Sequence, residues 1–251
     1  EVLQAENADT RLHPASLTKM MTLYIAFEAI RKGEISLDTM VTVSAKAAGE
    51  APSKLGLKKG QKIQMRYLIR AAAIKSANDA ATAIGEAISG SEDAFAARMT
   101  RTAKALGMKN TTFKNAHGLT QAGHLSTARD MTILGRHLIY DYPQYYNLFS
   151  RQSAHAGVGT VTSHNRLLKS YEGADGIKTG YTNAAGFNLV ASAQRGNVRI
   201  IATVFGGTST PARDAKVAQL LDLGFAKARK GGAVKTPPPP DYSVSEDVLV
   251  A

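Results

Sequence analysis

Apolar side chains crowd the segment "HPASLTKMMTLYIAFEAIRKGE", residues 13–34, and predict the first long helix of the chain. Pro14 suits the first turn of a helix and Gly33 suits its end. Ser16 falls in that first turn, so it can do chemistry only if this end of the helix reaches a cleft. Apolar positions lie nearly all round the helix, which is typical of a buried central helix; they are Met20, Met21, Leu23, Ile25, Phe27 and Ile30.

The middle of the chain is predicted to be mainly helical. Two short alternating runs, "MVTVS" and "QKIQM", predict strands that flank a loop rich in Gly, Pro and Lys. The stretch "RYLIRAAAIKSANDAATAIGEAI" predicts two helices with a break at residues 76–78. Ser91 opens a further helix that runs to about Leu106, and Thr127 with Asp130 forms a T-x-x-D capping pattern at the start of another.

From about Gly173 the pattern changes to strands. "GADGIKTGYT", "GFNLVASAQ" and "VRIIATVFGG" are rich in strand-forming residues, and residues 195–197 predict a turn between the last two. A final amphipathic helix, "PARDAKVAQLLDLGFAKARK", is expected to end at residues 231–232. The chain also opens on "EVLQAEN", which alternates like the second half of a strand. We therefore expect an α/β fold of the α+β type, in which one antiparallel sheet is built from both ends of the chain, with flanking helices and a mostly helical lobe.

The composition predicts one folded domain followed by a tail. A chain of 251 residues with 44% hydrophobic content can bury a sizeable core, and we expect this domain to span residues 1–232. Residues 233–251 are rich in proline, which favours a linker or a disordered tail. No signal peptide precedes "EVLQAEN", so we expect that the first strand of the domain is truncated.

The composition also excludes several kinds of site. The chain contains no cysteine, so neither a disulfide nor a cysteine nucleophile is available. Its six histidines are scattered without a metal-binding spacing, so we expect no metal and no cofactor. The formal net charge of +11 comes from dispersed Lys and Arg residues, which favours a solvated basic surface over nucleic-acid binding. No apolar run approaches the about 20 residues that cross a bilayer, since Glu28 interrupts "MMTLYIAFEAI".

The segment Ser16-Leu17-Thr18-Lys19 forms an S-x-x-K pattern. At this spacing both side chains lie on one face of the helix. A neutral lysine amine can then take the serine proton, and the start of the helix stabilises negative charge nearby. Two fixed positions make a weak signal, and the alternative is a capping serine beside a surface lysine.

Ser76-Ala77-Asn78 forms an S-x-N pattern at the predicted helix break. Ser and Asn are both good N-caps, so the alternative is an ordinary cap. A second S-x-N at residues 163–165 shows that the pattern is common.

Lys178-Thr179-Gly180 forms a K-T-G pattern in a strand-rich run. Gly180 allows a ligand to approach the strand closely, and Lys178 supplies a fixed positive charge. The alternative is a lysine at a turn or a sheet edge.

The order of the three patterns favours the functional interpretation, because S-x-x-K, S-x-N and K-T-G in this order are typical of penicillin-binding proteins and serine β-lactamases. The chain resembles the low-molecular-mass penicillin-binding proteins, which are D-alanyl-D-alanine carboxypeptidases of the S11 peptidase type with a β-lactamase/transpeptidase-like fold. The resemblance extends over about residues 1–230. It rests on the strings "PASLTKMMT", "IKSANDAATAI", "NTTFKNAHGL", "STARDM" and "DGIKTGYTNAAGFNLVASA".

The resemblance implies a role for each residue of the first two patterns. Ser16 is expected to be the nucleophile that forms an acyl-enzyme, and Lys19 its general base. Ser76 and Asn78 are expected to assist proton transfer and to hold the substrate amide. The backbone N–H groups of Ser16 and Tyr181 are expected to form the oxyanion hole.

The resemblance also implies a binding site for the substrate carboxylate. Lys178 and Thr179 are expected to bind it beside Gly180, and Lys178 is counted with the catalytic residues. Arg213 of "STPARDA" is expected to be a further partner, because a guanidinium binds a carboxylate in a forked geometry. The alternative for Arg213 is a solvated arginine in the first turn of the last helix.

The implied function is that of an exported DD-carboxypeptidase, in the periplasm or on the outer face of the cytoplasmic membrane. Its implied substrate is the peptidoglycan stem peptide, and β-lactam antibiotics are implied covalent inhibitors. The carboxy-terminal β-rich domain and anchoring helix of many relatives do not occur in this sequence. Membrane attachment is therefore in doubt, with a peripheral contact through missing segments as one option.

Other functions remain open at this point. A DD-endopeptidase that cuts cross-links would share all three patterns. A serine β-lactamase of class A would use a glutamate in an E-x-x-L-N segment, and this string is absent. The intact pair Ser16 and Lys19 argues against a non-catalytic wall-binding protein. The dispersed positive charge argues against a nucleic-acid-binding protein.

Overall fold

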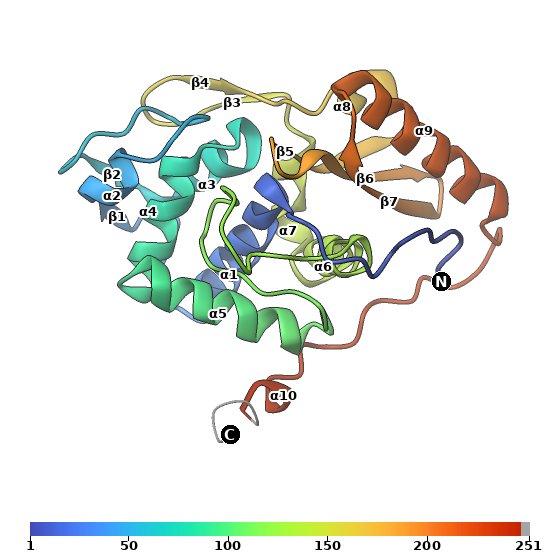
Figure 1. Cartoon of the computed structure of the whole chain (residues 1–251), viewed down its shortest axis with the longest axis horizontal. Helices are drawn as coiled ribbons and strands as arrows, with labels where there is room; N and C mark the ends of the chain where they lie inside the picture. Colours follow the sequence, from blue (N-terminus) through green and yellow to red (C-terminus); the bar gives the residue numbers. More distant parts are fainter. Residues whose placement is uncertain (247–251) are drawn as a thin grey trace.

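The central helix α1 (Thr18–Arg31) is buried along almost its whole length in the computed structural model of the chain (Figure 1). The structure describes residues 1–246. The α1 helix contacts α4, α5 and α6, as its apolar circumference predicted. It follows directly on a 3-10 turn, η1 (Ala15–Leu17), which carries Ser16 and contacts the sheet.

A mostly helical region follows α1 in the chain and lies on the left of Figure 1. Its first two strands pair antiparallel with each other, and Ser91 caps α5 by accepting the Ala94 N–H, so both predictions are confirmed. The elements are β1 (Met40–Thr42), α2 (Ala45–Ala48), β2 (Lys62–Gln64), α3 (Met65–Arg70), the π-helical turn η2 (Ala71–Lys75), α4 (Asn78–Ser89) and α5 (Glu92–Ala105).

The next helix, α6 (Ala128–Asp141), begins at the predicted cap Thr127, whose hydroxyl accepts the Asp130 N–H. The Asp130 carboxylate accepts hydrogen bonds from Asn110 N and Thr111 Oγ1. It therefore ties the preceding loop to α6. The elements that follow are α7 (Pro143–Tyr146), η3 (Asn147–Ser150), β3 (Ser153–His155), β4 (Thr160–Thr162) and α8 (Leu167–Ser170).

The main sheet consists of β5 (Ala174–Thr182), β6 (Gly186–Arg195) and β7 (Val198–Gly207), which pair antiparallel in chain order. The last long helix, α9 (Thr210–Lys227), packs against β6 and β7 (Figure 1). A small apolar cluster fills the space between the sheet and α9, and includes Leu189, Ala191, Val217 and Leu221. The mixed fold of helices and an antiparallel sheet is confirmed.

One detail of the predicted fold is wrong: the sheet is not built from both ends of the chain. Within residues 1–246, all strands of the main sheet come from residues 174–207. The segment "EVLQAEN" forms no strand there, and the chain turns at Asn7, whose carbonyl accepts the Thr10 N–H. A strand requires backbone hydrogen bonds to a neighbouring strand, and a short alternation of side chains does not supply them. Leu3 instead packs beside the cluster under α9, and its carbonyl accepts a hydrogen bond from Lys227 Nζ.

The α9 helix ends at Lys227, earlier than the predicted end at residues 231–232, because Ala228 already has an extended backbone. Residues 229–232, Arg-Lys-Gly-Gly, contain no apolar side chain that would continue the packed face of the helix. The proline-rich segment then returns to the helical region, where Asp241 N donates to the carbonyl of Ala105. The short helix α10 (Ser243–Glu246) contacts α5. The domain boundary at residue 232 stays a prediction, and residues 247–251 of the predicted tail lie outside the described residues.

Candidate active site

The Ser16 turn lies directly against the main sheet. Ala15 has a φ of +50°, in the left-handed region that is strained for a residue with a side chain. The fully buried Asn188 of β6 holds this turn, because its Nδ2 donates to the carbonyl of Pro14 at 3.2 Å. A Cβ added to Gly180 of β5 would lie 3.0 Å from the backbone nitrogen of Ser16. The glycine of the K-T-G pattern therefore allows the sheet to approach the serine, whereas the predicted approach of a ligand at this glycine stays a prediction.

Lys19 points from the first turn of α1 to the Ser16 hydroxyl. Its Nζ lies 2.9 Å from Ser16 Oγ, 2.7 Å from Asn78 Oδ1 and 2.9 Å from the carbonyl oxygen of His117. The side chain is fully buried. The predicted S-x-x-K pair and the S-x-N asparagine therefore meet around one amine, and the alternative of a surface lysine at position 19 is wrong.

Charge and burial set the protonation of this amine. Burial lowers the pKa of Lys19 well below its usual range, and the positive charge of Lys178 lowers it further. The carboxylates of Asp79 and Glu50 oppose this shift. A lowered pKa leaves a larger share of the amine neutral, and a neutral amine can accept the serine proton.

The S-x-N segment lies at the predicted break between η2 and α4. Ser76 has a left-handed backbone, with φ 61° and ψ 39°. Its buried Oγ has no hydrogen-bond partner among the groups of residues 1–246. Asn78 is held on its other side, because Nδ2 donates to the carbonyl of Ala51 at 2.8 Å. A strained residue with an unpaired buried hydroxyl is typical of a functional site.

The K-T-G segment forms the opposite wall of the site, in the middle of β5. Lys178 is buried, and its Nζ donates to the carbonyl of Thr179 at 2.8 Å. Burial, followed by the charge of Arg213, lowers the pKa of Lys178 to about 7. Thr179 is buried, whereas the Tyr181 ring is 50% exposed and stacks against Phe187.

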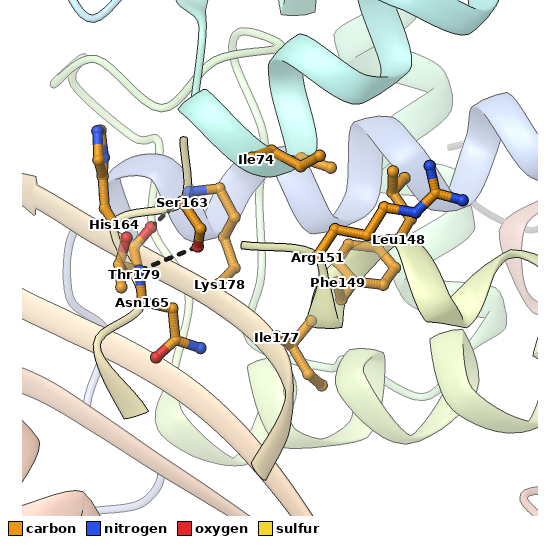
Figure 2. A pocket seen from close by; sticks show the side chains of 11 residues that line it. Ile74, Leu148, Phe149, Arg151, Ser163, His164, Asn165, Ile177, Lys178 and Thr179 are labelled. Carbon is orange, nitrogen blue, oxygen red and sulfur yellow. Dashed lines mark hydrogen bonds between the residues drawn. The ribbon is translucent and has the colours of Figure 1, made fainter. Parts of the chain in front are cut away.

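A small pocket beside Lys178 is lined by the second S-x-N segment, residues 163–165 (Figure 2). Asn165 Nδ2 donates to the carbonyl of Gly176, so this segment fixes the backbone just before the K-T-G residues. The pocket is also lined by Ile74, which precedes the first S-x-N segment. The second S-x-N therefore supports the wall that carries Lys178.

Arg213 is 4% exposed, so the alternative of a solvated surface arginine is wrong. It lies in the first turns of α9, whose N-cap is Ser209. Its guanidinium forms an ion pair with Asp214 at 3.0 Å and donates weakly to the carbonyl of Asn188. The positive charge of Arg213 also lies close enough to Lys178 to lower its pKa. Arg213 thus has a carboxylate partner, Asp214, and a neighbouring lysine.

The sequence interpretation missed three residues that hold this site. Asp79 follows the S-x-N segment directly, and its carboxylate accepts the N–H groups of Leu55, Gly56 and Leu57. Asn188 lies inside the string "GFNLVASA", and His117 inside "NTTFKNAHGL". Their partners are far away in the sequence, so no local pattern could have identified them.

Comparisons with known proteins agree with this geometry. A family model described as D-alanyl-D-alanine carboxypeptidase, peptidase S11, matches residues 1–209. The D-alanyl-D-alanine carboxypeptidase DacF of Bacillus subtilis (strain 168) is 41% identical over 232 residues, which are 90% of this chain and 59% of that relative. The chain thus spans about 59% of the length of this curated relative.

Solved structures show the same relationship. Penicillin-binding protein 5 of Haemophilus influenzae matches with a TM-score of 0.86 and 36% identity, over 94% of this chain and 72% of that chain. Penicillin-binding protein D2 of Listeria monocytogenes, in its ampicillin-bound form, matches with a TM-score of 0.78 and 33% identity, over 90% of this chain and 92% of that chain. The resemblance found in the sequence is confirmed: the chain belongs to the peptidase S11 family of D-alanyl-D-alanine carboxypeptidases.

Proposed function

We propose that the chain carries the active site of a serine DD-carboxypeptidase, which removes the terminal D-alanine from peptidoglycan stem peptides through an acyl-enzyme on Ser16. The observation that supports this most is the buried Lys19 amine, 2.9 Å from Ser16 Oγ. A serine with a base within hydrogen-bond distance, itself oriented by further groups, is the arrangement of an activated nucleophile.

The first step forms an ester. Ser16 Oγ attacks the carbonyl carbon of the penultimate D-alanine, and its proton passes to Lys19 Nζ. The backbone N–H groups of Ser16 and Tyr181 stabilise the oxyanion. The C–N bond then breaks, and the leaving D-alanine amine takes a proton from Lys19, with the Ser76 hydroxyl as the relay. The unpaired Ser76 Oγ supports this role, because it has a free lone pair and a free proton.

The second step releases the shortened peptide. A water molecule attacks the ester and gives its proton to Lys19, and the ester bond to Ser16 Oγ breaks. Lys19 then returns the proton to the serine, so the enzyme is regenerated. With a β-lactam the broken C–N bond belongs to the ring and the amine stays attached to the acyl group. The sequence lacks the E-x-x-L-N segment of class A β-lactamases, so we expect this adduct to persist.

Lys178, Thr179 and Arg213 are proposed to bind the terminal carboxylate beside Gly180. Two buried cations in one wall favour an anionic group, because bringing a carboxylate to them relieves their mutual repulsion. Asn78 is proposed to hold the substrate amide with the side chain that also contacts Lys19.

The peptidase domain is proposed to span residues 1–232 and to work outside the cytoplasmic membrane, in the periplasm or on the membrane's outer face, because peptidoglycan lies there. The proposed partners are stem peptides and β-lactams, with the ampicillin-bound relative in support of the latter. Within residues 1–246, none of the helices combines the length and the apolar character that crossing a bilayer requires.

The test has two parts. Incubation with fluorescent penicillin and mass spectrometry of the labelled peptide should place the adduct on Ser16, and an adduct on another residue would refute the mechanism. Incubation with a stem pentapeptide should release free D-alanine. Cleavage of a cross-linked dimeric stem peptide, without release of free D-alanine from the pentapeptide, would indicate an endopeptidase, and rapid turnover of penicillin would indicate a β-lactamase.

A further inference from the structure

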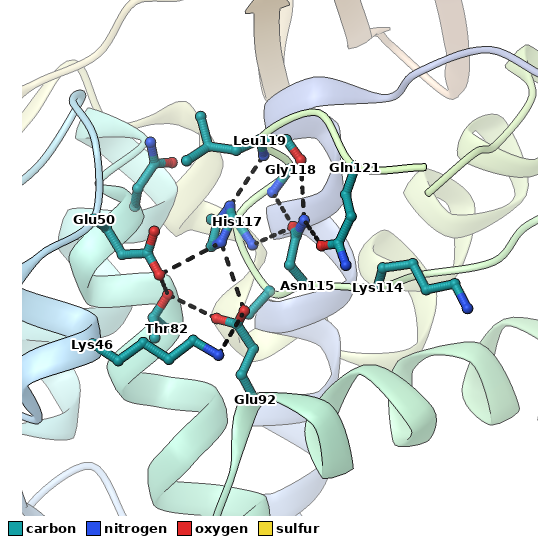
Figure 3. Close-up of polar contacts among 12 residues, drawn as sticks. Lys46, Glu50, Thr82, Glu92, Lys114, Asn115, His117, Gly118, Leu119 and Gln121 are labelled. Carbon is teal, nitrogen blue, oxygen red and sulfur yellow. Dashed lines mark hydrogen bonds and ion pairs between the residues drawn. The ribbon is translucent and has the colours of Figure 1, made fainter. Parts of the chain in front are cut away.

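A largely buried polar cluster surrounds the side chain of His117, whose carbonyl oxygen contacts Lys19 Nζ (Figure 3). It contains two carboxylates, from Glu50 and from Glu92 at the start of α5, which converge on His117 Nε2 at 3.6 Å and 3.8 Å. Thr82 Oγ1 of α4 lies 3.0 Å from an oxygen of each carboxylate. Lys46 Nζ of α2 lies 3.5 Å from Glu92 Oε1. The cluster thus joins four separate segments of the helical region.

The hydrogen bonds of His117 show which ring nitrogen carries the proton. The Leu119 N–H donates to His117 Nδ1 at 3.0 Å, so Nδ1 is the acceptor and the proton lies on Nε2. Burial and then the charge of Lys19 lower the pKa of His117 to about 3, so the ring is neutral at neutral pH. Its Nε2–H therefore faces the two carboxylates, at distances longer than a hydrogen bond, and the contact is the attraction of an N–H dipole to negative charge.

The same tautomer opposes a metal site, although Glu50, Glu92 and His117 have ligand atoms within 4.8 Å of one another. A metal ligand needs a lone pair on Nε2, and that nitrogen carries the proton here. Lys46 already places a positive charge beside Glu92. The geometry indicates that the carboxylates orient the imidazole by attracting its Nε2–H dipole.

The backbone of His117 has a second contact, on the catalytic side. Its carbonyl oxygen accepts the hydrogen bond from Lys19 Nζ. The loop is also braced on both flanks of this carbonyl. Asn115 Oδ1 accepts the N–H groups of His117 and Gly118 at 3.3 Å and 2.7 Å. A Cβ added to Gly118, whose φ is +98°, would lie 1.8 Å from the carbonyl oxygen of Ala15, so this loop presses on the Ser16 turn.

We propose that Glu50 and Glu92 are positioning residues for the acyl transfer: they hold the neutral His117 ring, and its carbonyl oxygen in turn fixes the Lys19 amine beside Ser16. This inference rests on the function proposed above and adds two carboxylates to it. They contact neither the substrate nor the reacting atoms. They act through the backbone of a third residue, in the way that outer groups orient a metal ligand.

Glu50 also acts on Lys19 through its charge. It raises the pKa of Lys19, as Asp79 of α4 does more strongly, against the lowering by burial and by Lys178 of β5. The Glu50 carboxyl itself has a raised pKa, chiefly because of burial, with Glu92 and Glu86 raising it and the Thr82 hydroxyl and Lys46 opposing. Removing the Glu50 charge must therefore lower the pKa of Lys19 further.

The experiment measures acylation by fluorescent penicillin against pH in the whole chain. Acylation needs the neutral amine, so it falls at low pH as Lys19 gains a proton. In Glu50→Gln the acidic limb of the acylation rate against pH should move to lower pH. The rate on the plateau should fall about tenfold, because the Lys19 amine is positioned less well beside Ser16. Glu172→Gln removes the same charge at an exposed position of the sheet region and should change neither.

Variants of His117 test the other half of the inference. His117→Leu removes the Nε2–H that faces the carboxylates and should lower the plateau rate about tenfold. His117→Gln can still donate to them and should recover most of this loss. The double variant Glu50→Gln/His117→Leu should lose little more than His117→Leu alone, because both changes break one path.

The results separate the inference from the proposed function. If penicillin does not acylate the wild-type chain, the proposed function is refuted. The inference about Glu50 and Glu92 would be wrong, with the proposed function intact, under one result. In that result penicillin acylates the wild-type chain, and Glu50→Gln and His117→Leu change neither the acidic limb nor the plateau of the acylation rate against pH. If His117→Leu loses its native circular dichroism, Glu50→Gln and His117→Gln still decide, since an unchanged plateau rate in Glu50→Gln contradicts the positioning role.

Discussion

Lys19 and Lys178 are both buried lysines of one site, yet the two walls around them are built differently. The Lys19 amine, on the helical wall, contacts three oxygen acceptors and is influenced by two carboxylates, Asp79 and Glu50. Lys178 Nζ, on the sheet wall, donates to the carbonyl of its neighbour Thr179. Burial lowers the pKa of Lys178, and the charge that lowers it further is that of the cation Arg213.

The difference teaches how one site can use the same residue type for two tasks. A base must be held in place and must be neutral part of the time, so the helical wall supplies acceptors and a balance of charges. A group that binds an anion needs no permanent carboxylate partner, so the sheet wall leaves Lys178 uncompensated. Its pKa is lowered to about 7, and a bound carboxylate favours its charged form. The predictions below test this division between proton transfer and carboxylate binding.

The largest effect is expected for Lys19→Ala. Acylation by fluorescent penicillin should fall about 10³-fold, because general base catalysis is lost. Circular dichroism should show a folded protein, and Lys169→Ala, a change at an exposed lysine of α8, should acylate normally. A Lys19→Ala chain that acylates at the wild-type rate would assign the base to another residue.

Arg213→Ala should affect binding of the carboxylate and leave proton transfer intact. The expected loss in kcat/KM for a peptide with a free carboxyl terminus is about 2–4 kcal/mol, the size of a lost charge-assisted contact. The same peptide with an amidated terminus lacks that contact and should be turned over nearly as before. Equal losses on both peptides would show that Arg213 supports the fold; Arg229→Ala, at an exposed arginine after α9, is the matched control.

Asp79→Asn should lower the stability of the helical wall, the side of the site that carries Lys19 and Asn78, and should leave carboxylate binding unchanged. The carboxylate accepts the N–H groups of Leu55, Gly56 and Leu57, and an amide would place a donor against one of them. Urea unfolding should show a loss of about 1–3 kcal/mol in the free energy of unfolding. The ratio of kcat/KM between the free acid and the amide should stay unchanged, and a changed ratio would contradict the division between the walls. Asp93→Asn, at an exposed position of α5, serves as the control.

The smallest effect concerns the pH dependence of carboxylate binding. The pKa of Lys178 is lowered to about 7, so the side chain is charged below this pH and loses its charge as the pH rises through it. KM for the free acid should therefore rise above pH 7, by roughly fivefold if about 1 kcal/mol of binding is lost. Lys178→Arg keeps its charge and should show no such rise. A rise of the same size with the amidated peptide would trace the effect to another group.

The local patterns predicted where the candidate site residues lie in the fold. Ser16 lies at the predicted start of a buried helix, Ser76 and Asn78 at the predicted break, and Lys178 on a predicted strand. Each prediction rests on a few neighbouring residues, because turns, caps and periodicity act over one or two turns of the chain. The catalytic roles of these residues stay predictions until the variants are measured.

The contacts that hold the site could not be predicted in this way. Asn188 supports the Ser16 turn from β6, and His117 meets Lys19 from a loop between α5 and α6. The first strand expected from "EVLQAEN" failed for the same reason, since an alternation of side chains does not reveal whether a partner strand is present.

The sequence by itself determined the long helices, the three strands of the main sheet and the three short patterns that they carry, because these depend on neighbours in the chain. The tertiary structure alone decided that Lys19 and Lys178 are buried within one site, that Arg213 is not a surface residue, and that two glutamates stand behind His117. Burial and the distances between remote charges set the pKa values of both lysines, and neither exists until the segments pack.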